Sequence, residues 1–216
     1  MRKLMTLLLM LCALWVHAQK IDADLLRIKQ RMDSVQHFSA MVTLNLDVPF
    51  IQMPTKNAEV NYQHGSGMKF ASKDFVMLPK RGLDFSMNEL FKHPFITVDR
   101  GTITRGGKML KVINLIPTDG KSDLVMAVLY MDTKARHLVE SEINTRKDGS
   151  YTLQMQYQPG QTLPQNVEAA FAIERLKIPL NFMGKDTKID RKKMRSMETK
   201  TGKIKMQFRY RDVKLG

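Results

Sequence analysis

The sequence contains a single cysteine, Cys12, which lies close to the amino terminus. If the segment around it is removed after export, the remaining chain has neither a disulfide bond nor a thiol nucleophile. A lipid-modified cysteine needs a small residue directly before it, and Met10 and Leu11 stand there instead. The stability of the domain must then come from its apolar core.

Long apolar runs are confined to the first 18 residues. These begin with Arg2 and Lys3, continue as an apolar run over residues 4–16 and end on Ala18. The order is typical of a cleaved secretion signal, and a run of about 13 residues is too short for a membrane-spanning helix. We expect residues 1–18 to be a signal peptide, and residues 19–216 to form one periplasmic domain.

Residues that would carry catalysis or hold a metal ion are sparse and scattered. The histidines beyond the signal occur singly, without the i, i+4 spacing of a metal-binding helix. There is no Gly-x-Ser-x-Gly elbow and no glycine-rich phosphate loop, and Glu140 and Glu142 fall on the expected solvent face of a strand. We therefore expect no enzyme, no catalytic residues, no metal and no cofactor. A Ser/His/Asp triad depends on geometry rather than spacing, so a secreted hydrolase stays an alternative.

Acidic residues are outnumbered by basic ones, which gives the chain a formal charge of +14. Loss of Arg2 and Lys3 with the signal lowers this charge to about +12. In an exported protein such an excess favours contact with acidic surfaces such as lipid headgroups rather than with nucleic acid. A charge that serves only solubility is the alternative.

Apolar residues take every second position from Val42 to Phe50, while Thr43, Asn45 and Asp47 take the positions between. The same alternation recurs at residues 58–62, 68–70, 151–157 and 204–210. It is the period of strands with one buried face, as in antiparallel sheets. Residues 124–131 are apolar without alternation, and we expect them at the sheet's centre. The apolar face of the sheet is either filled by helices or leaves an apolar pocket.

Three other segments complete the expected architecture. Residues 22–36 have the apolar stripe of an amphipathic helix that either caps the core or acts as a mobile lid. Residues 86–89 have the spacing of a capping box, which predicts a short helix over residues 87–92. The basic run at 183–203 predicts a solvated loop, with a membrane-facing patch as the alternative. Residues 165–172 fit either a short helix or a strand.

Four stretches carry a resemblance to a known family: DLLRIKQRMDSVQHFSAMVTLNLDVPF, VMLPKRGLDFSMNELF, INLIPTDGKSDLVMAVLYMDT and IKMQFRYRDV. Together they span nearly the whole chain beyond the signal. In these stretches the chain resembles the outer-membrane lipoprotein-sorting (LolA/LolB-like) superfamily. The resemblance implies an α+β domain, a single strongly curved antiparallel half-barrel with helices packed on its concave face. It also implies a monomeric carrier that moves acyl chains of lipoproteins or other lipids toward the outer membrane.

The sequence is rich in methionine, a flexible side chain that suits either irregular core gaps or a pocket for variable apolar ligands. Strand alternation and the helical stripe together predict the residues of the lipid-binding pocket: Val42, Leu44, Leu46, Val60, Tyr62, Met68, Phe70, Leu153, Met155, Met206 and Phe208, closed by Leu25 and Ile28. Tyr151, Tyr157, Ile204 and Tyr210 are second choices at the strand ends. Expected partners are lipid, a transiently contacted membrane and a membrane-associated protein. The main alternative is a lipid-sensing or protein-docking module of the same fold.

Overall fold

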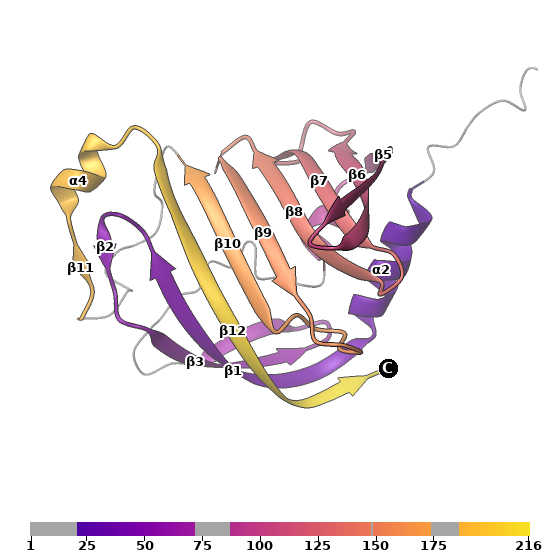
Figure 1. Cartoon of the computed structure of the whole chain (residues 1–216), viewed down its shortest axis with the longest axis horizontal. Helices are drawn as coiled ribbons and strands as arrows, with labels where there is room; N and C mark the ends of the chain where they lie inside the picture. Colours follow the sequence, from indigo (N-terminus) through magenta and orange to yellow (C-terminus); the bar gives the residue numbers. More distant parts are fainter. Residues whose placement is uncertain (1–20, 72–86, 148, 174–185) are drawn as a thin grey trace, which may run out of the picture.

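The computed structural model describes residues 21–71, 87–147, 149–173 and 186–216, and most of them belong to one large antiparallel sheet (Figure 1). The sheet has ten strands and is not closed, because β4 and β5 form two separate edges. The strand order is β4 (Gly67–Ala71), β3 (Lys56–Gln63), β1 (Val35–Asp47), β12 (Lys200–Leu215), β10 (Asn166–Ile173), β9 (Ser150–Gln156), β8 (His137–Thr145), β7 (Leu124–Asp132), β6 (Lys108–Pro117) and β5 (Phe95–Arg105). The expected large antiparallel sheet is confirmed, and a second sheet has two short strands. The expected signal peptide lies outside the described residues.

The two ends of the chain meet in the sheet, since β12 pairs with β1. Val42 lies opposite Phe208, and Leu44 lies opposite Met206. On its other side β12 pairs with β10, which places Val167 opposite Met206. Residues 165–172, which fitted a helix or a strand, are therefore largely strand. This pairing brings the apolar positions of three strands onto one face.

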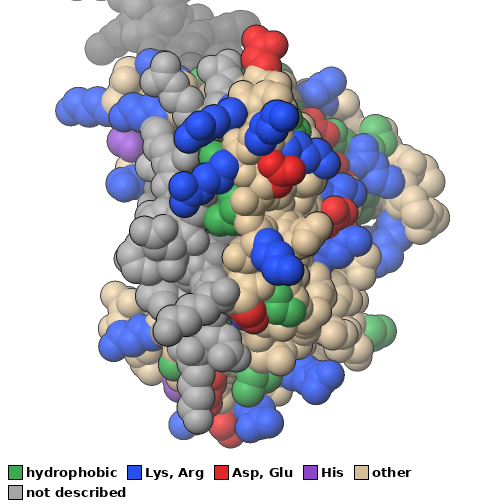
Figure 2. Space-filling model, turned by 90° about the vertical axis from the view of Figure 1, so that its left-hand side faces the viewer, with side chains coloured by type: hydrophobic (Ala, Val, Ile, Leu, Met, Phe, Trp, Pro, Cys, Tyr) green, Lys and Arg blue, Asp and Glu red, His purple; other side chains and the backbone are tan. Residues whose placement is uncertain are grey.

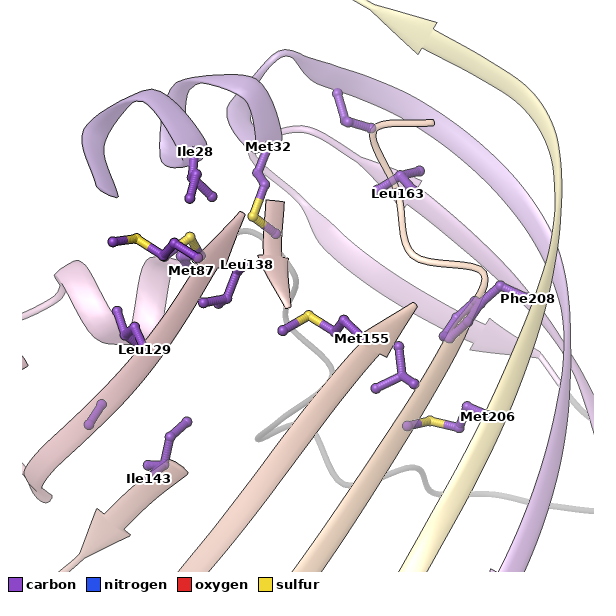
Figure 3. Packing of buried hydrophobic residues seen from close by; sticks show 14 of the residues in the cluster. Ile28, Met32, Met87, Leu129, Leu138, Ile143, Met155, Leu163, Met206 and Phe208 are labelled. Atoms are coloured by element: carbon purple, nitrogen blue, oxygen red, sulfur yellow. The ribbon is translucent and has the colours of Figure 1, made fainter. Parts of the chain in front are cut away.

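Helix α2 (Ala23–Asp33) packs on that face through its apolar stripe. Leu25, Ile28 and Met32 are buried and belong to the same apolar cluster as the inward residues of the sheet. Figure 3 shows Ile28 and Met32 pointing from α2 toward Met87 and Leu138. We call this set of buried residues the main cluster.

Residues 124–131 lack alternation because β7 is buried on both faces. Ala127, Leu129 and Met131 belong to the main cluster, whereas Val128 and Tyr130 belong to a second cluster on the opposite face. The expectation that this segment lies at the sheet's centre is wrong, since β7 is third from the β5 edge. Burial on both faces, rather than a central position, explains its composition.

One expectation about local structure is also wrong, and another is confirmed in part. The described part of the basic run is not a solvated loop: it forms β11 (Lys188–Ile189), which pairs with β2 (Ile51–Gln52), and helix α4 (Arg191–Ser196). Helix α3 (Asn88–Phe91) follows the N-cap residue Met87, which has φ 59° and makes no capping hydrogen bond through its side chain. A helix is present where the capping box predicted one, but Met87 is its N-cap, and Ser86 lies outside the described residues.

No helix in the described part of the chain is both long and apolar enough to cross a bilayer.

Candidate functional site

A cavity of about 280 Å³ lies between the helices and the inner face of β7 to β10. Its lining is apolar over most of its length and polar at one end. The lining residues are Met32, Met87, Leu90, Lys92, His93, Lys121, Ser122, Asp123, Leu124, Leu138, Ser141, Ile143, Thr145, Lys147, Tyr151, Leu153, Met155 and Val167. The cavity is close to the lower end of the volumes usual for small-molecule sites.

Strand alternation builds the sheet side of this cavity. Tyr151, Leu153 and Met155 occupy every second position of β9, so all three face inward. In the register with the neighbouring strands, Ile143 lies opposite Tyr151, and Val167 lies opposite Met155. Three adjacent strands thus present one continuous apolar wall.

Helical residues close the cavity opposite this wall. Met32 comes from the last turn of α2, and Met87 and Leu90 come from α3 and its N-cap. Met87 is buried even though its backbone has a positive φ, a conformation that is uncommon for a residue with a side chain. Three methionines, Met32, Met87 and Met155, therefore contribute flexible side chains to the lining.

The polar end of the cavity is organised around Asp119. Its carboxylate lies 3.1 Å from His93 Nδ1 and accepts a hydrogen bond from the backbone N–H of Ser122 at 3.2 Å. Burial alone would raise the pKa of Asp119. His93 and the backbone N–H groups of Ser122 and Lys121 outweigh burial and hold the pKa below its usual value. The turn fixes Lys121 and Ser122 beside the cavity.

The amino-terminal end of α2 is tied to the sheet by charged groups. Asp22 caps the helix by accepting hydrogen bonds from the backbone N–H groups of Asp24 and Leu25. Lys111 Nζ of β6 donates to Asp22 at 2.7 Å and to Asp24 at 2.9 Å. The hydrogen bond from Lys111 lowers the pKa of Asp24. Burial alone would lower the pKa of Lys111, but the carboxylates of Asp22 and Asp24 outweigh burial and raise this pKa.

The carboxyl-terminal end of α2 is tied to two loops by Arg31. Its Nη1 donates to the carbonyl oxygen of Ala135 at 2.6 Å, in the turn between β7 and β8. Its Nη2 donates to the carbonyl oxygen of Gln161 at 3.1 Å, in the connection between β9 and β10. The planar guanidinium can reach both loops at once, which a lysine ammonium does less well.

An aromatic pair lies beside Arg31. The rings of His137 and Tyr157 stack with centroids 3.8 Å apart, and the Tyr157 hydroxyl donates to the Leu138 carbonyl oxygen at 3.0 Å. His137 Nε2 lies 2.8 Å from the Gln161 carbonyl oxygen, so this nitrogen carries a proton and donates it. Burial lowers the pKa of His137 and raises that of Tyr157, which favours the neutral form of both rings.

Most of the residues predicted for the pocket lie in the main cluster but not in the cavity lining. Leu153 and Met155 line the cavity, as does the second choice Tyr151. The others are packed: Leu25, Ile28, Val42, Leu44, Val60, Met206 and Phe208 are buried, and Leu46, Tyr62 and Met68 are partly buried against the main cluster. The side chain of Phe70 lies outside the described residues.

Aromatic packing explains why the β1, β3 and β12 part of the face is filled. Phe38 stacks on Tyr62 with ring centroids 5.1 Å apart and meets the edge of Tyr210 at 5.2 Å. Phe208 stacks on Tyr210 at 5.6 Å, and the Tyr210 hydroxyl donates to the carbonyl oxygen of Pro164. Burial raises the pKa of Tyr210.

Sequence reasoning missed the contributions of β8 and of the α3 region to the lining. Leu138 and Ile143 face inward, but a register shift next to Tyr130 and Met131 interrupts the alternation of β8. The imperfect alternation of residues 137–145 was the available signal. Met87 carries no such signal, because its place in the lining depends on tertiary packing.

No group of three metal-binding side chains occurs among the described residues. Glu140, expected on a solvent face, is instead buried: it accepts hydrogen bonds from Arg105 Nη1 at 2.6 Å and from Gln154 at 3.2 Å. The Arg105 guanidinium also lies over the ring of Tyr130 at 4.6 Å. These contacts satisfy the carboxylate on the face opposite the main cluster, so a structural role explains its burial.

The chain matches known proteins only in a comparison of structures. No protein-family model matches the sequence, and no curated protein matches it. Among solved structures, a LolA superfamily protein from Nitrosomonas europaea matches at 10% identity and a TM-score of 0.44, over 89% of this chain and 93% of that chain. A domain from Vibrio parahaemolyticus assigned to outer membrane lipoprotein sorting matches at 12% identity and a TM-score of 0.42, over 87% and 92% of the two chains.

A DUF1329 family protein from Desulfovibrio piger matches at 11% identity and a TM-score of 0.44, over 89% of this chain and 90% of that chain. The solved structures to which the chain is similar thus include a LolA superfamily protein and an outer membrane lipoprotein-sorting domain, the family that the sequence resembles.

Proposed function

We propose that this chain binds acyl chains of lipids or lipoproteins in the cavity beneath α2 and carries them through the periplasm toward the outer membrane. In this proposal the signal peptide, residues 1–18, is removed, and residues 19–216 act as a monomeric domain. The sheet is a curved half-barrel, with α2 and α3 covering its concave face. The protein is a carrier and not an enzyme.

The observation that carries this proposal is the apolar lining of the cavity. Leu138, Ile143, Leu153 and Met155 come from the sheet, and Met87 closes the space from the helical side. Burial of apolar surface contributes about 25 cal/mol per Å², so a few hundred Å² of acyl chain supplies several kcal/mol before ordering costs. Such an affinity suits a carrier that must also release its ligand.

Helix α2 is the element that we assign to opening. Its polar contacts with the rest of the fold concentrate at its two ends, at Lys111 and at Arg31, while its middle packs through Leu25 and Ile28. Movement of this helix would extend the cavity toward the packed residues of β1, β3 and β12. The predicted pocket residues Val42, Leu44, Leu46, Val60, Tyr62, Met68, Phe70, Met206 and Phe208 would then receive the longer part of an acyl chain.

Contact with a membrane is assigned to the basic surface of α4. Arg191, Lys192, Lys193 and Arg195 are exposed, while Met194 of this helix packs against the small cluster around Phe50. Figure 2 views the molecule from the side on which α4 lies in Figure 1, and lysine and arginine side chains outnumber acidic ones there. Basic side chains at a surface attract anionic headgroups within about a Debye length of roughly 8 Å.

The test is native mass spectrometry of the protein purified from the periplasm of a host that expresses the full-length chain. We expect a protein mass that corresponds to cleavage after Ala18, together with an increment that solvent extraction identifies as phospholipid or acylated peptide. Uptake of a fluorescent apolar probe is compared between Leu153→Trp, which fills the cavity, and Val125→Trp, which adds the same ring at an exposed position of β7. Leu153→Trp should lose uptake, and Val125→Trp should keep it.

A mass without any increment, combined with no uptake of probe by the wild type, would overturn the carrier proposal. The alternative function, docking of a partner protein on the same fold, would then account for the chain better. Equal loss of uptake in both tryptophan variants would contradict the location of the site.

A further inference from the structure

The lining of the cavity changes along the strands, from apolar side chains at one end to basic side chains at the other. Leu138 begins β8 and Met155 lies near the end of β9, so these two mark the inner end of the cavity together with Met32 of α2. Thr145 and Tyr151 lie at the opposite ends of the same strands. Because strands rise about 3.4 Å per residue, the four residues from Tyr151 to Met155 give the apolar wall a length of roughly 14 Å.

Positive charge gathers at the end marked by Thr145 and Tyr151. Lys92, Lys121 and Lys147 belong to the lining and are exposed, whereas Asp123 is the single carboxylate among the described lining residues. The carboxylate of Asp119 lies beside this lining and is paired with His93. The three lysines come from different parts of the chain: the end of α3, the turn before β7 and the turn after β8. Folding therefore assembles a basic mouth on an apolar cavity.

A long apolar cavity with a basic mouth is complementary to an amphiphile with one acyl chain and an acidic end group. The lysine stems are apolar and flexible, so the ammonium groups can follow an anion at the mouth while the chain lies inside. Hydrogen bonds between an ammonium and a carboxylate or phosphate are stronger than those between neutral groups. A cationic or neutral end group would gain nothing comparable there.

We propose that the cavity selects acyl chains that end in an acidic group, a carboxylate or a phosphate, and that Lys121 and Lys147 recognise this group. The proposal rests on the proposed function, because it assumes that an acyl chain occupies the cavity. It adds the orientation of the ligand, with the end group between the lysines and the chain end near Met32 and Met155.

The test compares four dodecyl amphiphiles that share the chain and differ in the end group: dodecanoate, dodecyl phosphate, neutral monododecanoylglycerol and dodecyltrimethylammonium. Each is titrated against a fluorescent apolar probe bound to the mature protein, at concentrations below micelle formation, and displacement of the probe is measured. The key variant is Lys121→Gln combined with Lys147→Gln. Its matched control is Lys134→Gln combined with Lys214→Gln, which removes two exposed lysines outside the lining.

We expect both anionic ligands to bind about tenfold more tightly than the neutral one, the size of one or two charge-assisted contacts at an exposed mouth. The key variant should lose this preference and keep its affinity for the neutral ligand, while the control variant should keep both. Raising the salt concentration to about 0.5 M should weaken the preference, because salt screens exposed charges. A difference between dodecanoate and dodecyl phosphate identifies which acidic group is favoured.

Equal affinities for the neutral and anionic ligands would overturn the selectivity and leave acyl-chain binding intact. A preference for anions that survives in the key variant would overturn the assignment to Lys121 and Lys147. Failure of all four ligands, including the neutral one, would sink the proposed function and this inference with it.

Discussion

Lys111 Nζ lies 2.7 Å from Asp22 Oδ2, so the residue that caps α2 is also the residue that fixes the helix to β6. Loss of the Asp22 carboxylate would therefore remove the helix cap and the contact with β6 at the same time. Asp22 also donates its backbone N–H to Thr97 Oγ1 of β5 at 3.0 Å, which adds a second strand to the same junction. The start of α2 is thus determined by contacts with residues far away in the sequence.

Replacement of Lys111 by methionine should lower the free energy of unfolding by about 1–2 kcal/mol, because charge-assisted hydrogen bonds to two partly buried carboxylates are lost. The measurement is urea denaturation at neutral pH. Lys108→Met on the same strand is the control, since Lys108 is exposed. Equal destabilisation by both substitutions would contradict a specific role for Lys111.

The junction should also make stability depend on pH in the acid range. The pKa of Asp24 in the folded protein is held below its usual value of 3.8 by Lys111. The stability that this carboxylate contributes is therefore present above about pH 4 and is lost as the pH falls through the lowered folded pKa. Asp24→Asn should show a shallower loss between about pH 5 and pH 2.5. In a Lys111→Met background the same substitution should change this slope less, because only Arg27 then lowers the pKa of Asp24.

Arg31→Gln should loosen the carboxyl-terminal end of α2, because a glutamine cannot donate to the loops at Ala135 and Gln161 as the guanidinium does. Loss of about 1.4 kcal/mol of local stability would accelerate hydrogen exchange of the α2 amides roughly tenfold. Under the proposed function, the apolar probe should also enter faster. Arg27→Gln is the control, because Arg27 is exposed and pairs only locally with Asp24. Unchanged exchange in Arg31→Gln would rule out the tether.

Local pattern was enough to predict the sheet and its inner face. Val42 and Leu44 are buried where alternation placed them, and Ile28 is buried where the helical stripe placed it. Alternation shows which face of a strand is buried, but it does not show whether that face is covered by packed side chains or borders a cavity. The distinction depends on which strands meet: Phe38 and Tyr62 fill the face near β1, whereas the face near β9 stays hollow beneath Met87.

The high charge density of residues 183–203 led to a wrong prediction of their secondary structure for a similar reason. The run was expected to be a loop, yet Ile189 pairs with Ile51, and Met194 packs near Phe50. Asp190 caps α4 through the backbone N–H of Lys193. A few apolar residues with distant partners outweighed the many charges around them, and those partners are not visible in the local sequence.

Gly202→Ala should destabilise the protein by about 1–3 kcal/mol, because it overfills a packed site. A Cβ at Gly202 would lie 2.5 Å from Val48 Cγ2 and 2.8 Å from Phe171 Cζ. Gly120→Ala is the matched control, since nothing lies within 4 Å of a Cβ there. Thermal denaturation of the two variants should show a lower melting temperature for Gly202→Ala only. Equal melting temperatures for the two variants would mean that Phe171 and Val48 can move aside at little cost.

A comparison of Met155 with Met206 distinguishes a residue that lines the cavity from one that lies in the packed core. Both are buried, with exposed fractions of 5% and 3%, and both belong to the main cluster, but only Met155 lines the cavity. Truncation to alanine should cost either variant about 2–4 kcal/mol in stability. Only Met155→Ala enlarges the closed cavity at its inner end. Among fatty acids short enough to be held while α2 is closed, only this variant should therefore shift the preference toward longer chains. The measurement is displacement of the probe by a series of chain lengths, at a temperature where denaturation curves show both variants to be folded. If the two variants show the same chain-length profile, the inner end of the acyl chain does not lie at Met155.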